Sequence, residues 1–291
     1  MFFGFQVTFF LSAFEDLGFR PATLMDTFAE KVMSDPDSLN MKDIVVVLRV
    51  YSLLNHLPEG QDQQFLEALN SALTSYLPRI PNADLLRAVC GFCILGYLPQ
   101  PALDQLLQDE VLHDLRTGDG QNVEQNEMML RGVNLCLALD GHSEPGAPLL
   151  VEKRSSPPSS QFPDMRDVLL TLLGDASLFQ PNVKLTHGYS IDFEILMDAN
   201  RRKVVPSSET DQPTDSPSVQ RLAVLCAPVS AFCLGSRHPR GRTAMKMRHL
   251  RLLGYHVVLV HYPEFQKLKK NEAVQFLKGE IFSSEEHLGS D

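Results

Sequence analysis

Six basic side chains lie within fifteen residues near the C-terminal end of the chain. They are Arg237, Arg240, Arg242, Lys246, Arg248 and Arg251. Arginine presents a planar fork of N–H donors that matches the oxygens of a phosphate, and lysine adds a compact positive charge. Side chains of these types at this density predict the binding of a polyanion, and nucleic acid is the first such partner to consider.

The charge of the surrounding segment is opposite to that of the rest of the chain. Residues 221–278 carry eleven Lys/Arg and two acids, whereas residues 1–220 carry fifteen Lys/Arg and thirty Asp/Glu. The overall net charge of −10 therefore conceals a basic module attached to an acidic one. The alternative interpretation is that the cations only keep a helix face solvated, as charged helix faces commonly do.

A loop and a helix position these cations. The Gly and Pro residues of 235–241 predict a loop that allows close approach of a ligand to the backbone. From 242 to 253, apolar residues are mixed with basic ones in a pattern that favours a helix with one cationic face. Gly254 follows and is well placed to end this helix in the left-handed conformation.

Predicted strands flank this helix. The β-branched and aromatic residues of 255–262 predict a strand, which Pro263 ends. Residues 221–227 predict a buried strand upstream, and residues 264–281 predict a final helix. The order of strand, basic loop, helix, strand and helix predicts a small α/β domain.

The same segment carries a recognisable signature. The pattern G-R-x-A-M-K-x-R-H-L-x-x-L-G-Y-x-V-V, which begins at Gly241, resembles the centre of the RAP domain, and the likeness extends over 222–281. RAP domains end the proteins of the FAST kinase domain-containing family, which bind RNA in mitochondria. The stretch 189–198 resembles the segment that precedes RAP in that family. The resemblance implies a restriction-endonuclease-like fold for this domain and mitochondrial RNA as its partner.

Residues 1–140 predict a helical region. Three blocks, at 14–21, 52–58 and 93–99, each end an apolar helix, and they recur at intervals of about 40 residues. This pattern is typical of helical hairpins stacked as a repeat array, and an irregular helical bundle is the alternative. The region resembles the two helical modules that precede RAP in the FAST kinase domain-containing family.

The predicted fold class is a multi-domain α plus α/β protein, a helical-repeat-like array followed by a small α/β domain. The predicted parts are a helical region at 1–140, a flexible linker at 141–163, a helix and strand within 164–220 with a polar loop at 206–218, the RAP domain at 221–282 and a tail at 283–291. The linker and the loop are predicted from their Ser, Pro and Gly content.

Composition sets the outer limits. A chain of 291 residues that is 44% hydrophobic can bury a substantial core, and two domains are natural at this length. No apolar run is long enough to span a membrane, and five irregularly spaced cysteines suit a reducing compartment. The first ten residues do not have the pattern of a transit peptide. The resemblance implies the mitochondrial matrix, so we expect a fragment or alternative product without the targeting region.

Catalytic motifs are absent from the sequence, which has no Gly-rich phosphate loop, kinase-like lysine strand or nucleophile elbow. Cys90 and Cys93 have the spacing of a redox motif, but they lie within a predicted helix. Four histidines alternate among loop, helix and strand and predict no metal site; they are His238, His249, His256 and His261. The sequence therefore predicts no catalytic residue, metal or cofactor.

A metal-dependent ribonuclease is the enzymatic alternative, because a restriction-endonuclease-like fold holds Mg²⁺ with clustered acids and a nearby lysine. The candidate groups are Asp192, Glu194 and Asp198, followed by Lys203. Many RAP domains have an acid on the strand that corresponds to 222–227, but this chain has Ala227 and Ala231 at the approximate positions. We therefore expect RNA binding without cleavage.

The basic cluster predicts binding of nucleic acid, and the resemblance implies a protein that binds mitochondrial transcripts through the basic RAP domain and so sets their processing, stability or translation. The helical region would supply a surface for RNA or for protein partners. The competing interpretation is a protein-interaction scaffold for RNA-processing factors, in which contact with RNA is incidental.

Overall fold

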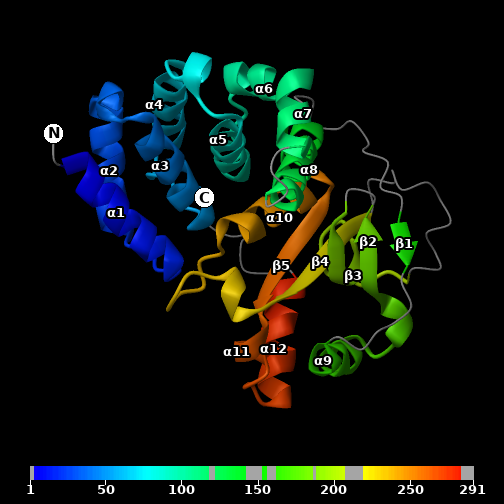
Figure 1. Ribbon diagram of the computed structural model, residues 1–291. Helices are drawn as coiled ribbons and strands as arrows, with labels where there is room; N and C mark the ends of the chain where they lie inside the picture. Colours follow the sequence, from blue (N-terminus) through cyan, green and yellow to red (C-terminus); the bar gives the residue numbers. More distant parts are fainter. Residues whose placement is uncertain are drawn as a thin grey trace, which may run out of the picture. The chain divides into compact units, whose positions relative to one another are not determined.

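The computed structural model describes residues 3–117, 122–141, 153–155, 162–185, 188–206 and 219–282. The chain forms two compact units (Figure 1). The helical unit comprises residues 1–143 together with 231–245, and the α/β unit comprises residues 144–230 together with 246–291. The basic segment of the sequence is thus divided between the two units, and each unit is discontinuous along the chain.

The helical unit consists of short amphipathic helices joined by tight turns. They are α1 (Phe3–Asp16), α2 (Ala22–Ser34), α3 (Met41–Leu53), α4 (Asp62–Thr74), α5 (Asn82–Ile94), α6 (Gln100–Leu106), α7 (Asp109–Thr117) and α8 (Val123–Asp140). Helices α1, α3, α5 and α8 pack in sequence against one another, and α2, α4 and α6 form a second row. The core between them includes the fully buried rings of Tyr51, Phe65 and Phe92.

The turns after α1, α3 and α5 share one backbone geometry. A single residue in each has a positive φ: Gly18 at 67°, Asn55 at 50° and Gly96 at 83°. Its amide donates to the carbonyl three residues earlier, and the next amide donates to the carbonyl five residues earlier, over 2.8 to 3.2 Å. This is the hydrogen-bond pair of the Schellman motif, which satisfies carbonyls at a helix C-terminus. A proline stands three residues beyond each of these residues and prevents the helix from continuing.

A pair of rings closes each of these three turns. The ring centroids lie 5.7 Å apart for Phe14 and Phe19, 5.8 Å for Tyr51 and His56, and 5.3 Å for Phe92 and Tyr97. In each pair, the second residue donates its amide to the carbonyl of the first, so the ring contact and the hydrogen bond stabilise the same turn. The turns coincide with the three blocks that the sequence predicts.

The α/β unit contains a mixed sheet in the order β1-β2-β3-β4-β5. Its strands are β1 (Lys153–Ser155), β2 (Phe179–Leu185), β3 (Ser190–Asp198), β4 (Val219–Ala227) and β5 (Tyr255–His261). Neighbouring strands are antiparallel except β4 and β5, which are parallel. Helix α10 (Gly241–Leu252) lies in the connection between the parallel strands, as such a crossover requires.

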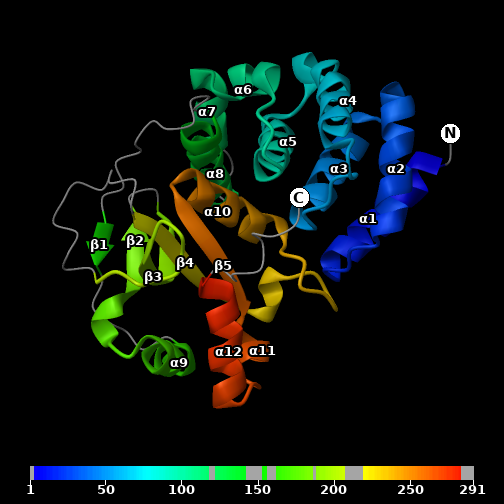
Figure 2. The same cartoon turned by 180° about the vertical axis from the view of Figure 1, so that it is seen from behind.

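One face of the sheet packs against two helices, α9 (Pro163–Leu173) and α12 (Lys270–Ile281). Alternate residues of β3 and β4, such as Phe193, Ile195 and Val224, meet Leu277 and Ile281 in this core. Figure 2 shows α9 and α12 together from behind. The fold is therefore α plus α/β, as the sequence predicts. Gly254 has a φ of 82° directly after the last turn of α10, in the conformation expected of it.

The structure corrects one element of the prediction. Residues 264–281 do not form one helix, because the turn α11 (Tyr262–Phe265) ends before α12 begins at Lys270. The carboxylate of Glu272 accepts the amide of Lys269 at 3.0 Å, which starts a new helix at that point. None of the described helices is long and apolar enough to cross a bilayer.

The remaining domain boundaries stay predictions. Most of the linker at 141–163, most of the loop at 206–218 and the tail at 283–291 lie outside the described residues. Within the linker range, the described residues Lys153–Ser155 pair with β2 as an edge strand.

Candidate nucleic-acid interface

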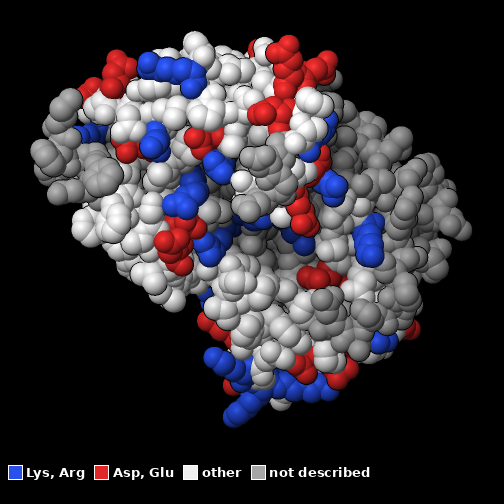
Figure 3. Space-filling model, in the orientation of Figure 1, with Lys and Arg blue, Asp and Glu red and all other residues white. Residues whose placement is uncertain are grey.

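The structure assigns the six predicted cations to different units. Three of them, Arg237, Arg240 and Arg242, belong to the helical unit, and Lys246, Arg248 and Arg251 belong to the α/β unit. The division falls within α10, between Met245 and Lys246. On the face drawn in Figure 3, basic and acidic side chains are interspersed.

The loop that carries the first cations has a defined backbone. The amide of Cys233 donates to the carbonyl of His238 at 2.9 Å, and Phe232 and Pro239 form an antiparallel bridge beside this bond. These contacts close the loop on itself. Gly235 turns the chain with a φ of 68°. The buried side chain of Cys233 joins the core of the helical unit, so the loop is part of that unit rather than an appendage.

This loop binds the C-terminal ends of α1 and α3. The amide of Leu234 donates to the carbonyl of Gly18 at 2.8 Å, and Nε2 of His238 donates to the carbonyl of Asn55 at 2.8 Å. The last carbonyls of a helix have no partner within the helix, and they carry its partial negative charge. The loop therefore supplies donors to the two turns that contain Gly18 and Asn55.

Arg240 extends the same arrangement. Its Nη2 lies 3.5 Å from Oε1 of Glu15 and donates to the carbonyl of Glu15 at 3.5 Å. Oε2 of Glu15 also lies 3.6 Å from Nη1 of Arg49, so one nearly buried carboxylate joins two arginines. A positive charge at the C-terminus of α1 is favourable to the helix dipole. Arg240 is therefore committed to packing of the helical unit.

Gly241 brings the start of α10 against the helices. An added Cβ at this position would lie 1.8 Å from the carbonyl oxygen of Ser52 and 2.8 Å from the side chain of Ile94. A residue with a side chain cannot occupy this position without displacing α3 and α5. The close approach fixes the next residue, Arg242, whose side chain is exposed.

In the α/β unit, Lys246 is half-buried and interacts with the charge of an acid, Asp192. Burial lowers the pKa of its ammonium group, and the charge of Asp192 opposes this shift. Burial likewise raises the pKa of the Asp192 carboxyl, against the hydrogen bond at 2.8 Å from the amide of Cys226 and the charge of Lys246. Arg248 is half-buried and Arg251 is exposed. Lys246 thus balances the charge of the partly buried Asp192 within its own unit.

The three candidate metal ligands of β3 make hydrogen bonds with different partners. Oε1 of the buried Glu194 accepts the hydroxyl of Tyr255 at 2.9 Å. Oδ1 of Asp198 accepts the amides of Arg202 and Lys203 at 2.7 and 3.0 Å, and these bonds lower its pKa. Six residues of strand separate Asp192 from Asp198, about 20 Å, so they cannot hold a common cation.

The Cys90–Cys93 pair lies within α5, as the sequence predicts. Burial raises the pKa of the Cys90 thiol to about 12, and the pKa of Cys93 is also raised, first by its hydrogen bond with Cys136 and then by burial. Thiols in this state are protonated and poor nucleophiles or metal ligands. At least three of the four candidate histidines have local partners. His238 binds Asn55, Nδ1 of His249 lies 2.7 Å from the hydroxyl of Tyr189, and Nδ1 of His261 accepts the amide of Glu264 at 3.4 Å.

The sequence did not reveal which basic residues join Arg242. Arg49 of α3 and Arg87 of α5 line the same cavity of the helical unit as Arg242. The three residues are far apart in the chain, and no motif or local periodicity links them. Their association depends on how α3, α5 and α10 pack.

Three family models match the chain. FAST kinase-like protein, subdomain 1, covers residues 44–116; FAST kinase-like protein, subdomain 2, covers residues 144–206; and the RAP domain covers residues 224–280. The first match lies in the helical unit, and the RAP match contains all six predicted cations.

Curated relatives match over almost the whole chain. FAST kinase domain-containing protein 2, mitochondrial, of Homo sapiens is 45% identical over 289 residues, which is 96% of this chain and 39% of that protein. The protein of the same name from Mus musculus is 44% identical over 280 residues, 96% of this chain and 40% of that protein. FAST kinase domain-containing protein 3, mitochondrial, of Homo sapiens is 26% identical over 273 residues, 89% of this chain and 40% of that protein. The chain thus spans about two fifths of the relatives that it matches.

Proposed function

Because this chain belongs to the FAST kinase domain-containing protein family, we propose that it binds RNA in mitochondria and acts in RNA processing, stability or translation. The observation that carries the proposal is the RAP match at residues 224–280, which encloses the cationic segment 237–251. The relatives at 44–45% identity are named as mitochondrial proteins, which supports the compartment.

The packing narrows the residues that we propose to contact phosphate. Arg240 pairs with Glu15, and the half-buried Lys246 interacts with the charge of Asp192, so we propose that these two act indirectly, by holding the loop and α10 in place. The proposed RNA contacts are Arg237, Arg242, Arg248 and Arg251. Their exposure ranges from half-buried to exposed, which suits side chains that meet a flexible polyanion.

Two finer features of the fold belong to this proposal. We propose that the helical unit is a repeat array, supported by the three turns with the same positive-φ residue, hydrogen bonds and ring pair. We also propose a restriction-endonuclease-like origin for the sheet, supported by the family likeness and by the mixed β3-β4-β5 arrangement. Such an array presents an extended surface, which suits a single strand of RNA.

Salt-dependent RNA binding tests the proposal. Replacement of Arg237, Arg242 and Arg248 with Glu should weaken the affinity for single-stranded RNA regardless of sequence. It should also flatten the slope of log affinity against log salt by about 0.7 for each lost phosphate contact. The matched control carries the same charge change at Arg79, Arg116 and Arg166, which lie outside the RAP match. Equal affinity and slope in the two triple variants would remove the RAP segment from the RNA-binding surface.

A protein-interaction scaffold is the second candidate, and the charge of the helical region favours it. Residues 1–143 carry eight Lys/Arg against nineteen Asp/Glu, a balance that attracts basic protein surfaces. We do not propose catalysis by a kinase or nuclease mechanism, because Asp192, Glu194 and Asp198 are engaged separately. The purified chain with Mg²⁺ should therefore leave bound RNA intact, as checked by electrophoresis of end-labelled RNA.

A further inference from the structure

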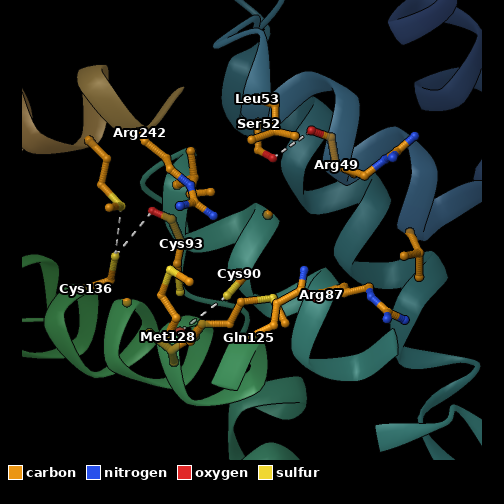
Figure 4. Close-up of a pocket in the computed structure, with 17 residues that line it drawn as sticks. Arg49, Ser52, Leu53, Arg87, Cys90, Cys93, Gln125, Met128, Cys136 and Arg242 are labelled. Atoms are coloured by element: carbon orange, nitrogen blue, oxygen red, sulfur yellow. Dashed lines mark hydrogen bonds between the residues drawn. The ribbon is translucent and has the colours of Figure 1, made fainter. Parts of the chain in front are cut away.

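A cavity of about 440 Å³ opens in the helical unit. Residues of α3, α5, α8 and the first turns of α10 line it (Figure 4). This volume lies within the range of about 300 to 1,000 Å³ that is usual for sites of small organic molecules, and it is too small for a helix or a folded partner.

The charge of the cavity lining is opposite to that of the unit. Its charged residues are Arg49, Arg87 and Arg242, and none of the described lining residues is an acid. Figure 4 shows Arg242 directed from α10 into the space between α3, α5 and α8. Arg49 and Arg87 have side chains that are 44% and 43% exposed and already face Glu15 and Asp84. An arginine directed into a cavity whose lining has no described acid, with two more arginines at its edge, indicates an anionic ligand.

The remainder of the lining is apolar and rich in sulfur. It includes Cys90, Cys93, Met128, Met129, Cys136 and Met245. The thiol of Cys136 lies 3.6 Å from the sulfur of Met245, and Met128 remains 54% exposed. Polarisable sulfur atoms make favourable contacts with aromatic rings, and flexible methionine side chains adapt to rings of different shape. This surface suits a flat, uncharged aromatic group.

We propose that this cavity binds one nucleotide of a single-stranded RNA, with its phosphate on Arg242 and its base against the methionine and cysteine side chains. The inference rests on the proposed function. It adds a site that combines two residues of the RAP match, Arg242 and Met245, with residues of α3, α5 and α8. Arg49 contributes positive charge from α3, and Gln125, also in the lining, supplies an amide for the polar edge of the base. An acidic peptide would use the arginines but would leave the sulfur-rich surface without an aromatic partner.

Gly132 provides a variant that tests the cavity without removing any charge. This glycine lies in α8 and lines the cavity, and an added Cβ would meet no atom within 4 Å. Gly132→Leu should therefore fill the cavity while favouring the helix, since leucine and alanine both have higher helix propensity than glycine. Gly132→Ala is the matched control, because it has the same effect on the backbone and adds only one methyl group.

The experiment measures the affinity of the full chain for fluorescein-labelled single-stranded RNA by fluorescence anisotropy, with thermal unfolding as the check on folding. Gly132→Leu should weaken binding about tenfold, which is the effect of losing one stacked base, and Gly132→Ala should change it little. Arg242→Gln should flatten the salt slope by about 0.7, whereas Gly132→Leu should leave the slope nearly unchanged.

The outcomes separate this inference from the proposed function. If Gly132→Leu binds RNA as tightly as the unmodified chain, and the triple RAP variant still loses affinity, the cavity is overturned and the proposed function stands. If the unmodified chain does not bind RNA at all, both fail. A poly-glutamate peptide could displace the RNA from the unmodified chain but not from Gly132→Leu. That result would assign the cavity to an acidic peptide and overturn the proposed nucleotide site.

Discussion

The guanidinium of Arg240 lies 3.5 Å from the carboxylate of Glu15, although 225 residues separate them in the chain. The two side chains are 29% and 10% exposed, so solvent screens their interaction only in part. A residue within the RAP match thus stabilises the C-terminus of α1. The likeness of a segment to an RNA-binding domain does not make each of its arginines an RNA contact.

The first prediction separates these two roles. Arg240→Ala should lower the free energy of unfolding by about 1 kcal/mol, since it removes a partly buried ion pair and a donor to a helix terminus. Urea denaturation followed by circular dichroism measures this change. The variant Arg251→Ala, at an exposed position of α10, is the control and should weaken RNA binding with little change in stability. A stable Arg240→Ala chain that has lost RNA affinity would return Arg240 to the RNA contacts.

The second prediction concerns the start of α10. Gly241→Ala should lower the free energy of unfolding by about 1 to 3 kcal/mol, because its Cβ would meet the carbonyl oxygen of Ser52 at 1.8 Å. Gly279→Ala in α12 is the matched control, since its Cβ has no atom within 4 Å, and it should be neutral or stabilising. Similar unfolding midpoints for the two variants would mean that the loop does not pack against α3 as described.

The third prediction is a loss of stability in mild acid. Nδ1 of the buried His56 accepts a hydrogen bond from Arg20 at 2.9 Å, and its Nε2 donates to Asp26 at 2.8 Å, which is the pattern of a neutral ring. Burial lowers the pKa of His56, against the effect of Asp26, while Arg20 and His238 lower it further. Burial also lowers the pKa of His238.

The direction of the pH effect follows from these shifts. An unfolded histidine binds a proton below about pH 6.5, whereas these folded histidines bind it only at lower pH. The free energy of unfolding should therefore be greatest above pH 6.5 and fall as the pH decreases from 6.5 toward the folded pKa values. His56→Gln should reduce this slope between pH 7 and 5, and His113→Gln, at an exposed position, should preserve it. An unchanged slope in His56→Gln would show that other groups cause the acid sensitivity.

Local patterns predicted the elements of this protein better than their association. The run 255–261 and the glycine at position 254 specify a strand and a helix end through residue types alone, and both occur as predicted. The break between α11 and α12 was missed, because the capping by Glu272 is a local bond within a segment of continuous helical pattern. The six clustered cations are visible in the sequence, but their distribution between two units depends on packing.

The cavity could not be found from the sequence for the same reason. Arg49 and Arg87 lie on amphipathic helices, where an arginine ordinarily marks a solvated face. Only the packing of α3 against α5, and of both with the start of α10, brings these residues to one cavity with Arg242. In contrast to the cavity, the ring pairs at the three turns leave a local pattern in the sequence. Their two members are always five residues apart, which can be recognised once the turn is known.

The discontinuous helical unit has a consequence for synthesis on the ribosome. The helices up to Asp140 emerge well before the segment 231–245, which supplies Cys233 to their core and donors to the carbonyls of Gly18 and Asn55. The nascent helical region must therefore wait, incompletely closed, until about ninety further residues have been translated, a matter of seconds at usual elongation rates. During that interval the ends of α1 and α3 are open to chaperones and proteases, so the late segment supplies the closing step in the folding of the helical unit.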